Sequence, residues 1–206
     1  EPRNGSVSIR ISSNSEFTEA MLSANERIKT EELKEGDHIK VYVVEVRKGS
    51  RGPQVLISRT HPGLVKRLFE TEVPEIYDGV VEIKAVSREA GSRTKMAVRA
   101  TMEGVDPVGA CVGPHGDRVA AVVAALNGEK IEIVVWSEDP CQYVKAALSP
   151  ADEISVSLVP GQKACSVVVP DDQLSLAIGK EGQNARLAAR LTGYKIDIKP
   201  ASYTGE

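Results

Sequence analysis

The sequence lacks any hydrophobic run of the roughly 20 residues that a membrane-spanning helix requires. Its first residues, Glu1 to Gly5, contain neither an initiator Met nor the apolar core of a signal peptide. We therefore expect a cytoplasmic chain with no membrane partner, and we expect it to be a piece of a longer protein. With 206 residues, 41% of them hydrophobic and 27% charged, the chain has the composition of a globular protein with room for two or three small domains.

Cysteine and histidine are scarce. The three cysteines, Cys111, Cys141 and Cys165, form no C-x-x-C pair, and the three histidines do not complete a ligand spacing. We expect reduced, mostly buried thiols and no metal or other cofactor. The sequence also offers no Ser-His-Asp set and no carboxylate pair, so we expect no enzymatic activity.

An excess of positive charge is also absent, because 26 Lys and Arg face 29 Asp and Glu for a net charge of -3. This balance argues against a general polyanion binder. The charge is uneven, however, and two stretches, 41–67 and 173–199, are cation-rich with only Glu45, Glu181 and Asp197 as acids. Their cations are Arg47, Lys48, Arg51, Arg59, Lys66, Arg67, Lys180, Arg186, Arg190, Lys195 and Lys199. Any polyanion binding is therefore expected to be local.

What the sequence does contain is a repeat with an offset of 65 to 66 residues. Each copy has a Gly-x-x-Gly loop between two helical patterns and then a strand of the type Lys-Ile-acid-Ile. The first loop is Gly113 to Gly116 and the second is Gly179 to Gly182. A loop of this kind is what a KH module uses to clamp about four nucleotides of backbone. The repeat therefore predicts a single-stranded RNA binder.

The loop chemistry follows from its residue types. Glycine tolerates unusual backbone angles and has no Cβ to hold a phosphate away from the main chain, and the amides that begin the next helix favour an anion. Lys180 adds a cation to the second loop, whereas the first offers Pro114 and His115, so the second loop is expected to be the stronger phosphate site. A nucleotide-hydrolysing P-loop is excluded, because neither loop provides G-x-x-x-x-G-K-[ST]. The predicted RNA-binding residues are Gly113, Pro114, His115, Gly116, Arg118, Gly179, Lys180, Glu181, Gly182, Gln183, Asn184 and Arg186.

Several of these residues have an equally ordinary structural interpretation. Gln183, Asn184 and Arg186 follow the second loop and could be a solvated helix face, and Arg186 with Arg190 could pair with acids on a neighbouring element. Aliphatic residues beside the loops could line a base-binding groove or belong to the core; they are Val112, Val119, Ile178 and Ala185. Aromatics are few, at 4%. Tyr42 and Phe17 could stack on a base or be core residues, and Trp136 is expected to pack between the two units.

Local patterns predict the elements around the loops. Both units read helix, strand, strand, helix, loop, helix, strand, which is the order of the bacterial-type KH fold. In the first unit we expect a helix over 62–70 and strands over 80–86, 94–100 and 130–136. In the second we expect a helix capped by Asp139 and strands over 154–158 and 164–169. Ahead of both units, β-type alternation over 7–11 and 38–46, with 54–58 as hairpin partner, predicts a small barrel without its first strand.

Four stretches resemble the NusA family of bacterial transcription factors: 57–64, 72–79, 107–114 and 170–187. The similarity extends from about residue 36 to 199. It implies an α+β protein with a partial OB-fold barrel followed by two type II KH domains that act as one rigid RNA-binding unit. The expected division is 1–60 barrel, 61–74 linking helix, 75–137 first KH domain and 138–202 second KH domain. The polymerase-anchoring domain and the first part of the barrel that the family carries are not in the sequence, and residues 12–30 match only loosely.

The resemblance further implies binding to RNA polymerase, other transcription factors and nascent RNA, with effects on pausing, termination and antitermination. We expect a monomer. A protein-docking scaffold with a weak RNA groove is the alternative, suggested by the acidic balance and by Pro114 in the first loop. A phosphorolytic ribonuclease is disfavoured, because that family places its KH domain before the barrel.

Overall fold

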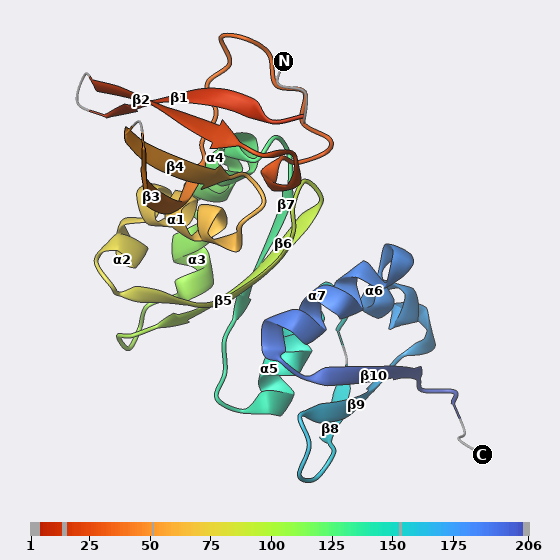
Figure 1. The fold of residues 1–206 in the computed structure, drawn as a ribbon. Coiled ribbons are helices and arrows are strands. Elements are labelled where there is room, and N and C mark those ends of the chain that lie inside the picture. The colour runs from red at the N-terminus through yellow and green to blue at the C-terminus, as the bar shows by residue number, and fades with distance from the viewer. Residues whose placement is uncertain (1–4, 14–15, 51, 153, 204–206) are drawn as a thin grey trace.

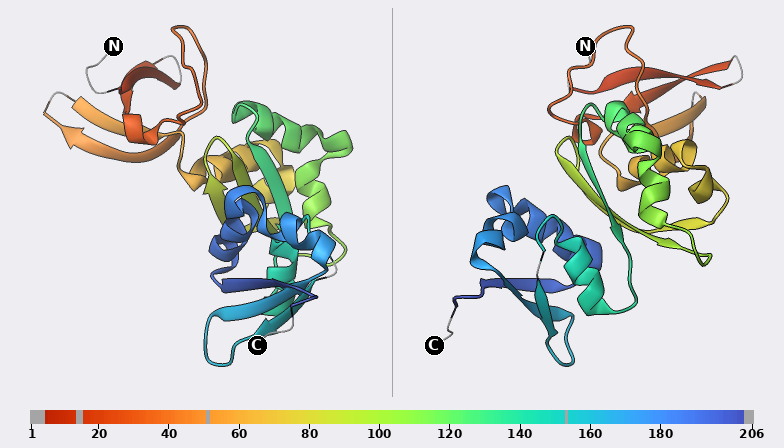
Figure 2. Two further views of the ribbon diagram at one scale, coloured as in Figure 1. Left: turned by 90° about the vertical axis from the view of Figure 1, so that its right-hand side faces the viewer. Right: turned by 180° about the vertical axis from the view of Figure 1, so that it is seen from behind.

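The computed structural model describes residues 5–13, 16–50, 52–152 and 154–203. Three parts follow one another along the chain, an N-terminal sheet and two α+β units of the same design (Figure 1). The N-terminal sheet and the second unit lie on opposite sides of the first unit (Figure 2). The first α+β unit is therefore the centre of the molecule.

The N-terminal sheet has the strand order β1-β2-β4-β3. Its strands are β1 (Val7–Ser13), β2 (Glu16–Leu22), β3 (Tyr42–Gly49) and β4 (Gly52–Ser58), and a short 3-10 turn, η1 (Ala24–Glu26), follows β2. The predicted hairpin of β3 and β4 is confirmed, but β3 begins at Tyr42 rather than at residue 38. Strand β2 was not predicted, although it pairs with both β1 and β4.

This sheet is open, with β1 and β3 at its edges, as expected of a partial barrel. Its core is small and centres on Ala20, Leu22 and Ile57. Val43, Val44 and Val46 of β3 are exposed, so both faces of this edge strand are uncovered. That one barrel strand is missing stays a prediction.

The first KH unit places helices on one face of a three-stranded sheet. Its elements are α1 (Pro62–Glu72), α2 (Pro74–Tyr77), β5 (Val81–Glu89), β6 (Arg93–Ala100), α3 (Pro107–Val112), η2 (Pro114–Gly116), α4 (Asp117–Ala125) and β7 (Lys130–Val135). The strand order is β5-β6-β7, with β5 antiparallel and β7 parallel to β6. Helix α1 contributes Leu64, Val65, Leu68 and Phe69 to the core of this unit. The predicted helix over 62–70 is confirmed, and it packs into the first KH unit as well as linking it to the barrel.

The second KH unit repeats the design. Its elements are α5 (Pro140–Ala147), β8 (Ser155–Leu158), β9 (Ala164–Val169), η3 (Asp171–Gln173), α6 (Leu174–Ile178), η4 (Lys180–Gly182), α7 (Gln183–Thr192) and β10 (Lys195–Pro200). The order β8-β9-β10 again combines an antiparallel pair with a parallel pair. Asp139 caps α5 by accepting a hydrogen bond from the Cys141 amide, as predicted. Gly193, at a φ of 75°, ends α7.

The two KH units share a core. Ala97 and Val134 of the first unit belong to the buried cluster of the second, and Trp136 packs against this cluster with its ring 6.4 Å from that of Tyr143. The predicted place of Trp136 between the units is therefore confirmed. Strand β6 is consequently covered on both faces, and even Lys95 is buried. Its ammonium donates to Glu132 at 2.6 Å and to the Ser149 carbonyl at 2.7 Å, whereas burial lowers the pKa of Lys95.

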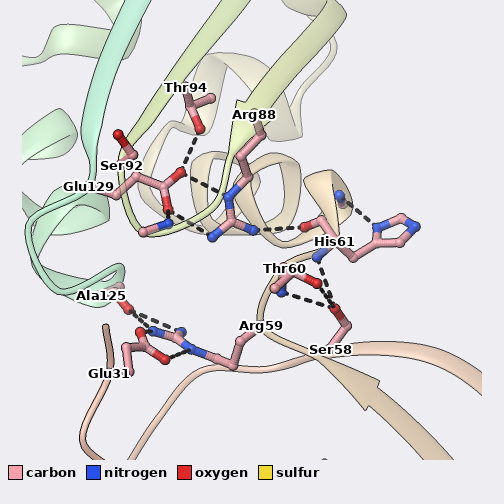
Figure 3. A network of polar contacts seen from close by, with 12 residues as sticks. Glu31, Ser58, Arg59, Thr60, His61, Arg88, Ser92, Thr94, Ala125 and Glu129 are labelled. Carbon is pink, nitrogen blue, oxygen red and sulfur yellow. Dashed lines mark hydrogen bonds and ion pairs between the residues drawn. The ribbon is translucent and has the colours of Figure 1, made fainter. Parts of the chain in front are cut away.

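Two buried ion pairs lie at the junction between the N-terminal sheet and the first KH unit, and Arg59 of one pair bridges the junction through its bond to the Ala125 carbonyl (Figure 3). Arg59 is fully buried, where it pairs with Glu31 and donates to the carbonyls of Lys40 and Ala125. Nearby, Arg88 donates to both oxygens of Glu129 at 2.8 and 2.9 Å. Burial by itself would raise the pKa of Glu129, but hydrogen bonds from Arg88, Thr94 and the Gly91 amide hold it below its ordinary value. In both networks, charged side chains are buried in the protein interior, where hydrogen bonds and ion pairs satisfy them.

Candidate nucleic-acid interface

The two Gly-x-x-Gly loops have the same backbone conformation. The first glycines, Gly113 and Gly179, have φ/ψ of 78°/171° and 75°/170°. The last glycines, Gly116 and Gly182, are left-handed at 77°/17° and 73°/13°. In each loop the amide of the last glycine donates to the carbonyl of the first at 3.1 Å. Two sequences that differ at both middle positions therefore build one structure.

The third position of each loop is also left-handed, although it is not glycine. His115 has a φ of 55° and Glu181 a φ of 54°. A side chain in this region costs about 1 kcal/mol or more, so the surrounding structure must hold it there. His115, Glu181, Pro114 and Lys180 are all exposed. The four middle side chains therefore face solvent, where a ligand can reach them.

The two glycines of a loop serve different purposes. A Cβ on Gly113 would overlap Asp117 and Arg118, and a Cβ on Gly179 would lie 2.8 Å from both the amide nitrogen and the Cβ of Asn184. A Cβ on Gly116 would meet nothing within 4 Å. The first glycine is therefore needed for packing against the following helix. The last glycine leaves an open surface, which a phosphate backbone could approach closely.

The residue five positions after the first glycine closes each loop from the inside. Arg118 Nη1 donates to the Ala110 carbonyl at 2.7 Å and to Glu75 at 2.7 Å. Asn184 Nδ2 donates to the Ala177 carbonyl at 3.0 Å and to the Leu148 carbonyl at 3.1 Å. Both side chains thus satisfy a carbonyl of the helix that precedes their loop.

Asn184 is fully buried, so its side chain is not at the surface of this structure, and its RNA contact stays a prediction. Its polarity serves the carbonyls on either side of it. Arg118 is partly buried, with 24% of its side chain exposed. Its RNA contact stays a prediction, and such a contact would require Arg118 to release Glu75 or the Ala110 carbonyl.

The first turns of α7 face the first KH unit. Gln183 Nε2 donates to Glu89 at 2.9 Å and to the Ser92 hydroxyl at 2.8 Å. Arg186 donates to Glu89 through Nε at 2.6 Å and through Nη2 at 3.1 Å, and Arg190 lies 3.5 Å from the same carboxylate. The alternative that Arg186 and Arg190 pair with an acid on a neighbouring element is therefore confirmed. RNA contacts by Gln183 and Arg186 stay predictions.

Glu89 is the residue of this region that sequence patterns missed. It ends β5, 90 positions before Gly179, and nothing in its local sequence distinguishes it from the other acids of the chain. Hydrogen bonds from Arg186, helped by Gln183 and the charge of Arg190, lower the pKa of Glu89 from 4.5 to about 2. The carboxylate is therefore ionised at neutral pH.

Apolar surface lies beside the second loop. Leu176 and Ile178 of α6 are 46% and 37% exposed, although α6 packs against β10. Val112 occupies the place of Ile178 before the first loop and is partly buried. The groove interpretation therefore suits Ile178 best, whereas Val119 packs against the core of the first unit.

The cation-rich stretch 41–67 is less basic at the surface than its sequence suggests. Arg59 is buried, Arg47 pairs with Glu45 at 2.8 Å, and Arg67 pairs with Glu70 at 2.6 Å. Arg51 lies outside the described residues. By contrast, Lys180 makes no ion pair within the described part of the chain. Lys180 is thus available to an anion.

The two candidate stacking aromatics differ. The Tyr42 ring stacks on that of His61, with centroids 4.5 Å apart and planes 7° from parallel, and it fills the space above Gly63. Phe17 is 65% exposed, with Arg10 over its ring at 5.6 Å. Tyr42 therefore belongs to the junction between the sheet and the first KH unit. Phe17 keeps a free ring face as a candidate for stacking.

The described residues contain no cluster of three or more His, Cys, Asp or Glu that could hold a metal ion. Cys111 and Cys165 are buried free thiols, and burial raises the pKa of Cys111 to about 12. Among the described residues, no helix has the length and apolar character needed to cross a membrane.

Comparison with known proteins agrees with this architecture. The model of the NusA-like first KH domain matches residues 59–136, so its match includes α1, and the model of the NusA-like second KH domain matches residues 140–205. Among the relatives that bear the name transcription termination/antitermination protein NusA are three from different bacteria. The one from Halalkalibacterium halodurans is 59% identical over 91% of this chain and 49% of its own length. The one from Bacillus subtilis is 61% identical over 88% and 49%, and the one from Thermus thermophilus is 49% identical over 89% and 47%.

This chain spans about half the length of these relatives. The matches nevertheless cover both KH units and continue into the N-terminal sheet. They coincide with the two domains whose loops share one backbone conformation. The chain belongs to the NusA family.

Proposed function

We propose that this chain is the RNA-binding part of a bacterial transcription elongation factor. In this role it associates with RNA polymerase and other transcription factors, binds nascent single-stranded RNA, and modulates pausing, termination and antitermination. The observation that carries the proposal is the pair of Gly-x-x-Gly loops with one backbone conformation in adjacent KH domains. We also propose that the protein acts in the cytoplasm as a monomer, without a cofactor and without catalysing a reaction.

The loops would bind the RNA backbone rather than individual bases. Their left-handed last glycines leave room for a phosphate, and the first amides of α4 and α7 provide donors and the positive end of a helix dipole. Lys180 adds a cation that the first loop lacks. The proposed contacts are Gly113, Pro114, His115, Gly116, Gly179, Lys180, Glu181 and Gly182. The bases would then lie along the exposed apolar side chains of α6, namely Leu176 and Ile178.

The test is fluorescence anisotropy of this chain with short single-stranded RNAs and with DNAs of matching sequence, at two salt concentrations. The informative variant is Lys180→Asp with Glu181→Asp, because Asp tolerates the left-handed region and both side chains face solvent. We expect RNA affinity to fall at least about fivefold, and the salt slope to become shallower by about 0.7, the contribution of one phosphate of a single strand.

A matched control is Lys163→Asp in the turn between β8 and β9. It is exposed and changes the net charge by the same two units as the loop variant. We expect its RNA affinity to stay within about twofold of the wild type, because it removes no phosphate contact. Equal affinity of the folded loop variant and the wild type would refute the proposal.

The protein-docking scaffold remains a second candidate, and two observations favour it. Three cations of the N-terminal part, Arg47, Arg59 and Arg67, are paired with acids within the chain. Tyr77 of α2 is 81% exposed beside Pro74 and the Arg67–Glu70 pair. Under this alternative, capture of polymerase by the chain would be insensitive to nuclease, and Tyr77→Ala would weaken it. Under the RNA-binding proposal, nuclease would weaken the capture and Tyr77→Ala would leave RNA affinity unchanged.

A further inference from the structure

Glu89 of the first KH domain is occupied entirely by one helix of the second. Its Oε1 accepts from Arg186 Nε at 2.6 Å, and its Oε2 accepts from Arg186 Nη2 at 3.1 Å and from Gln183 Nε2 at 2.9 Å. Arg190 Nη1 lies 3.5 Å from Oε1. The carboxylate therefore holds the guanidinium of Arg186 in a bidentate arrangement, which fixes the plane as well as the position of that group.

The same guanidinium reaches the second loop. Arg186 Nη1 donates to the Glu181 carbonyl at 3.1 Å. Because the guanidinium is rigid and planar, fixing Nε and Nη2 on Glu89 also fixes the direction of Nη1. Glu181 is the loop residue with the unfavourable φ of 54°. A donor held against its carbonyl stabilises this conformation.

The first loop has no such support. The position 66 residues before Arg186 is Ala120, whose side chain has no donor. His115 adopts the same left-handed conformation as Glu181 without a corresponding arginine. The link from Glu89 through Arg186 to a loop carbonyl is thus particular to the second KH domain.

We propose that Glu89 is a positioning residue for the second loop, acting through Arg186 on the Glu181 carbonyl. The proposal rests on the proposed function, because it assumes that this loop takes the RNA backbone. It makes RNA binding by the second KH domain depend on its docking against the first. By thermodynamic linkage, RNA bound at the second loop also strengthens the docking of the two domains.

Glu89 could instead act as a decoy that occupies Arg186 and Arg190, two cations that an RNA phosphate would otherwise attract. The two roles predict opposite results for Glu89→Gln. Loss of positioning lowers RNA affinity and leaves the salt slope unchanged, because no phosphate contact is lost. Release of a decoy raises affinity and steepens the slope, because new phosphate contacts form. The bond from Nη1 to the loop carbonyl favours positioning.

The first experiment needs no RNA. Amide hydrogen exchange of Gly182, which donates to the Gly179 carbonyl, is measured by NMR in the wild type and in Glu89→Gln. The Gly116 amide, which makes the same bond in the first loop, is the internal control. Glu82→Gln is the matched variant, because Glu82 lies on the same strand and pairs with Arg99 and Lys84 of its own sheet. We expect the Gly182 amide to exchange faster in Glu89→Gln than in the wild type. The Gly116 amide should be unchanged in both variants, and the Gly182 amide should be unchanged in Glu82→Gln. Unchanged exchange at Gly182 would overturn the proposal.

The second experiment measures RNA affinity of Glu89→Gln, Arg186→Lys and the double variant. Lysine keeps the charge but cannot form the bidentate pair. We expect each single change to weaken RNA binding about three- to tenfold, the range of one or two hydrogen bonds. The double variant should bind RNA as tightly as the single variant with the lower RNA affinity, because Glu89 acts through Arg186 and the two effects do not add.

Two outcomes separate this proposal from the proposed function. A Glu89→Gln variant that binds RNA as tightly as the wild type, or more tightly with a steeper salt slope, overturns the positioning role while the RNA-binding function stands. A wild type that binds no RNA, together with faster Gly182 exchange in Glu89→Gln, overturns the function and leaves the positioning of the loop intact.

Discussion

The loop of the first KH domain and the loop of the second follow the same backbone path but are supported by different side chains. The first is closed by Arg118, which is partly exposed and pairs with Glu75 of its own domain. The second is closed by the buried amide of Asn184 and is further held by Arg186, which depends on Glu89 of the other domain. The comparison shows that one loop conformation can be stabilised locally or across a domain interface. The second loop should consequently be the more sensitive to substitutions around it.

The largest difference is expected for the first glycine of each loop. Gly179→Ala should lower the free energy of unfolding by about 3 kcal/mol, because the new Cβ would press on the backbone of α7 in a backbone region almost restricted to glycine. Gly113→Ala should cost about 2 kcal/mol, because the two closest atoms, Asp117 Oδ1 and Arg118 Cγ, can rotate away and leave only Arg118 Cβ at 2.9 Å. Urea unfolding followed by circular dichroism measures both.

Gly182→Ala is the control for these two variants. Its Cβ would make only an ordinary contact, 4.0 Å from Arg186 Nη1, so the left-handed φ is the main cost, about 1 kcal/mol. A smaller loss of stability for Gly179→Ala than for Gly182→Ala would show that contact with Asn184 does not constrain the loop.

A moderate difference is expected between the two closing side chains. Asn184→Ala should lower the free energy of unfolding by about 2 kcal/mol, because it leaves the buried Ala177 carbonyl without its donor. It also removes one of the two donors to the Leu148 carbonyl, which keeps the Ala151 amide. Arg118→Ala should cost about 1 kcal/mol, because water can replace a partly exposed side chain. Thermal unfolding of the two variants measures this difference in stability, and the RNA affinity of each folded variant is measured beside it. An Asn184→Ala variant that is as stable as the wild type but binds RNA more weakly would support a direct RNA contact by Asn184.

The smallest effect is expected from titration of Glu89. Its pKa is lower in the folded protein, at about 2, than the ordinary value of 4.5, so folding favours the ionised form. Its contribution is fully present above about pH 5 and is lost as the pH falls toward 2. The wild type should therefore exceed Glu89→Gln in stability by about 1 kcal/mol at pH 7, because the partners Arg186 and Arg190 are half exposed and screened.

Urea unfolding of both proteins from pH 7 to pH 3 measures this difference. The stability advantage of the wild type should shrink below pH 5, as Glu89 becomes protonated and loses its charged bond to Arg186. A difference that stays constant down to pH 3 would show that the ionised form of Glu89 contributes nothing through Arg186.

Local sequence was sufficient for the elements that local rules control. The Asp139 cap with Pro140 predicted the start of α5, and the repeated glycines predicted the site of both loops. Strand β2 was missed, because its pattern of exposed residues lacks the alternation that marks a half-buried strand. Its assignment depends on pairing with β1 and β4, which only the fold brings beside it.

The roles of individual polar residues were less predictable. Arg59 and Asn184 have sequence contexts typical of exposed residues, yet both are fully buried. A buried polar group is tolerated where its hydrogen-bond partners are present. The partners here are carbonyls and a carboxylate from distant elements, such as Ala125 for Arg59 and Leu148 for Asn184. No pattern within a short window contains that information.

From the sequence, periodicity, caps and the conformational freedom of glycine predicted the helices and strands of the two KH units and the positions of their two glycine loops, because these rules act over a few residues. The partial barrel ahead of them was implied by the resemblance to the NusA family. The tertiary structure alone decided which polar side chains remain available to a ligand and which hold the protein together. Glu89, Arg186 and the Glu181 carbonyl come from two domains, and their contacts exist only once the second domain packs against the sheet of the first.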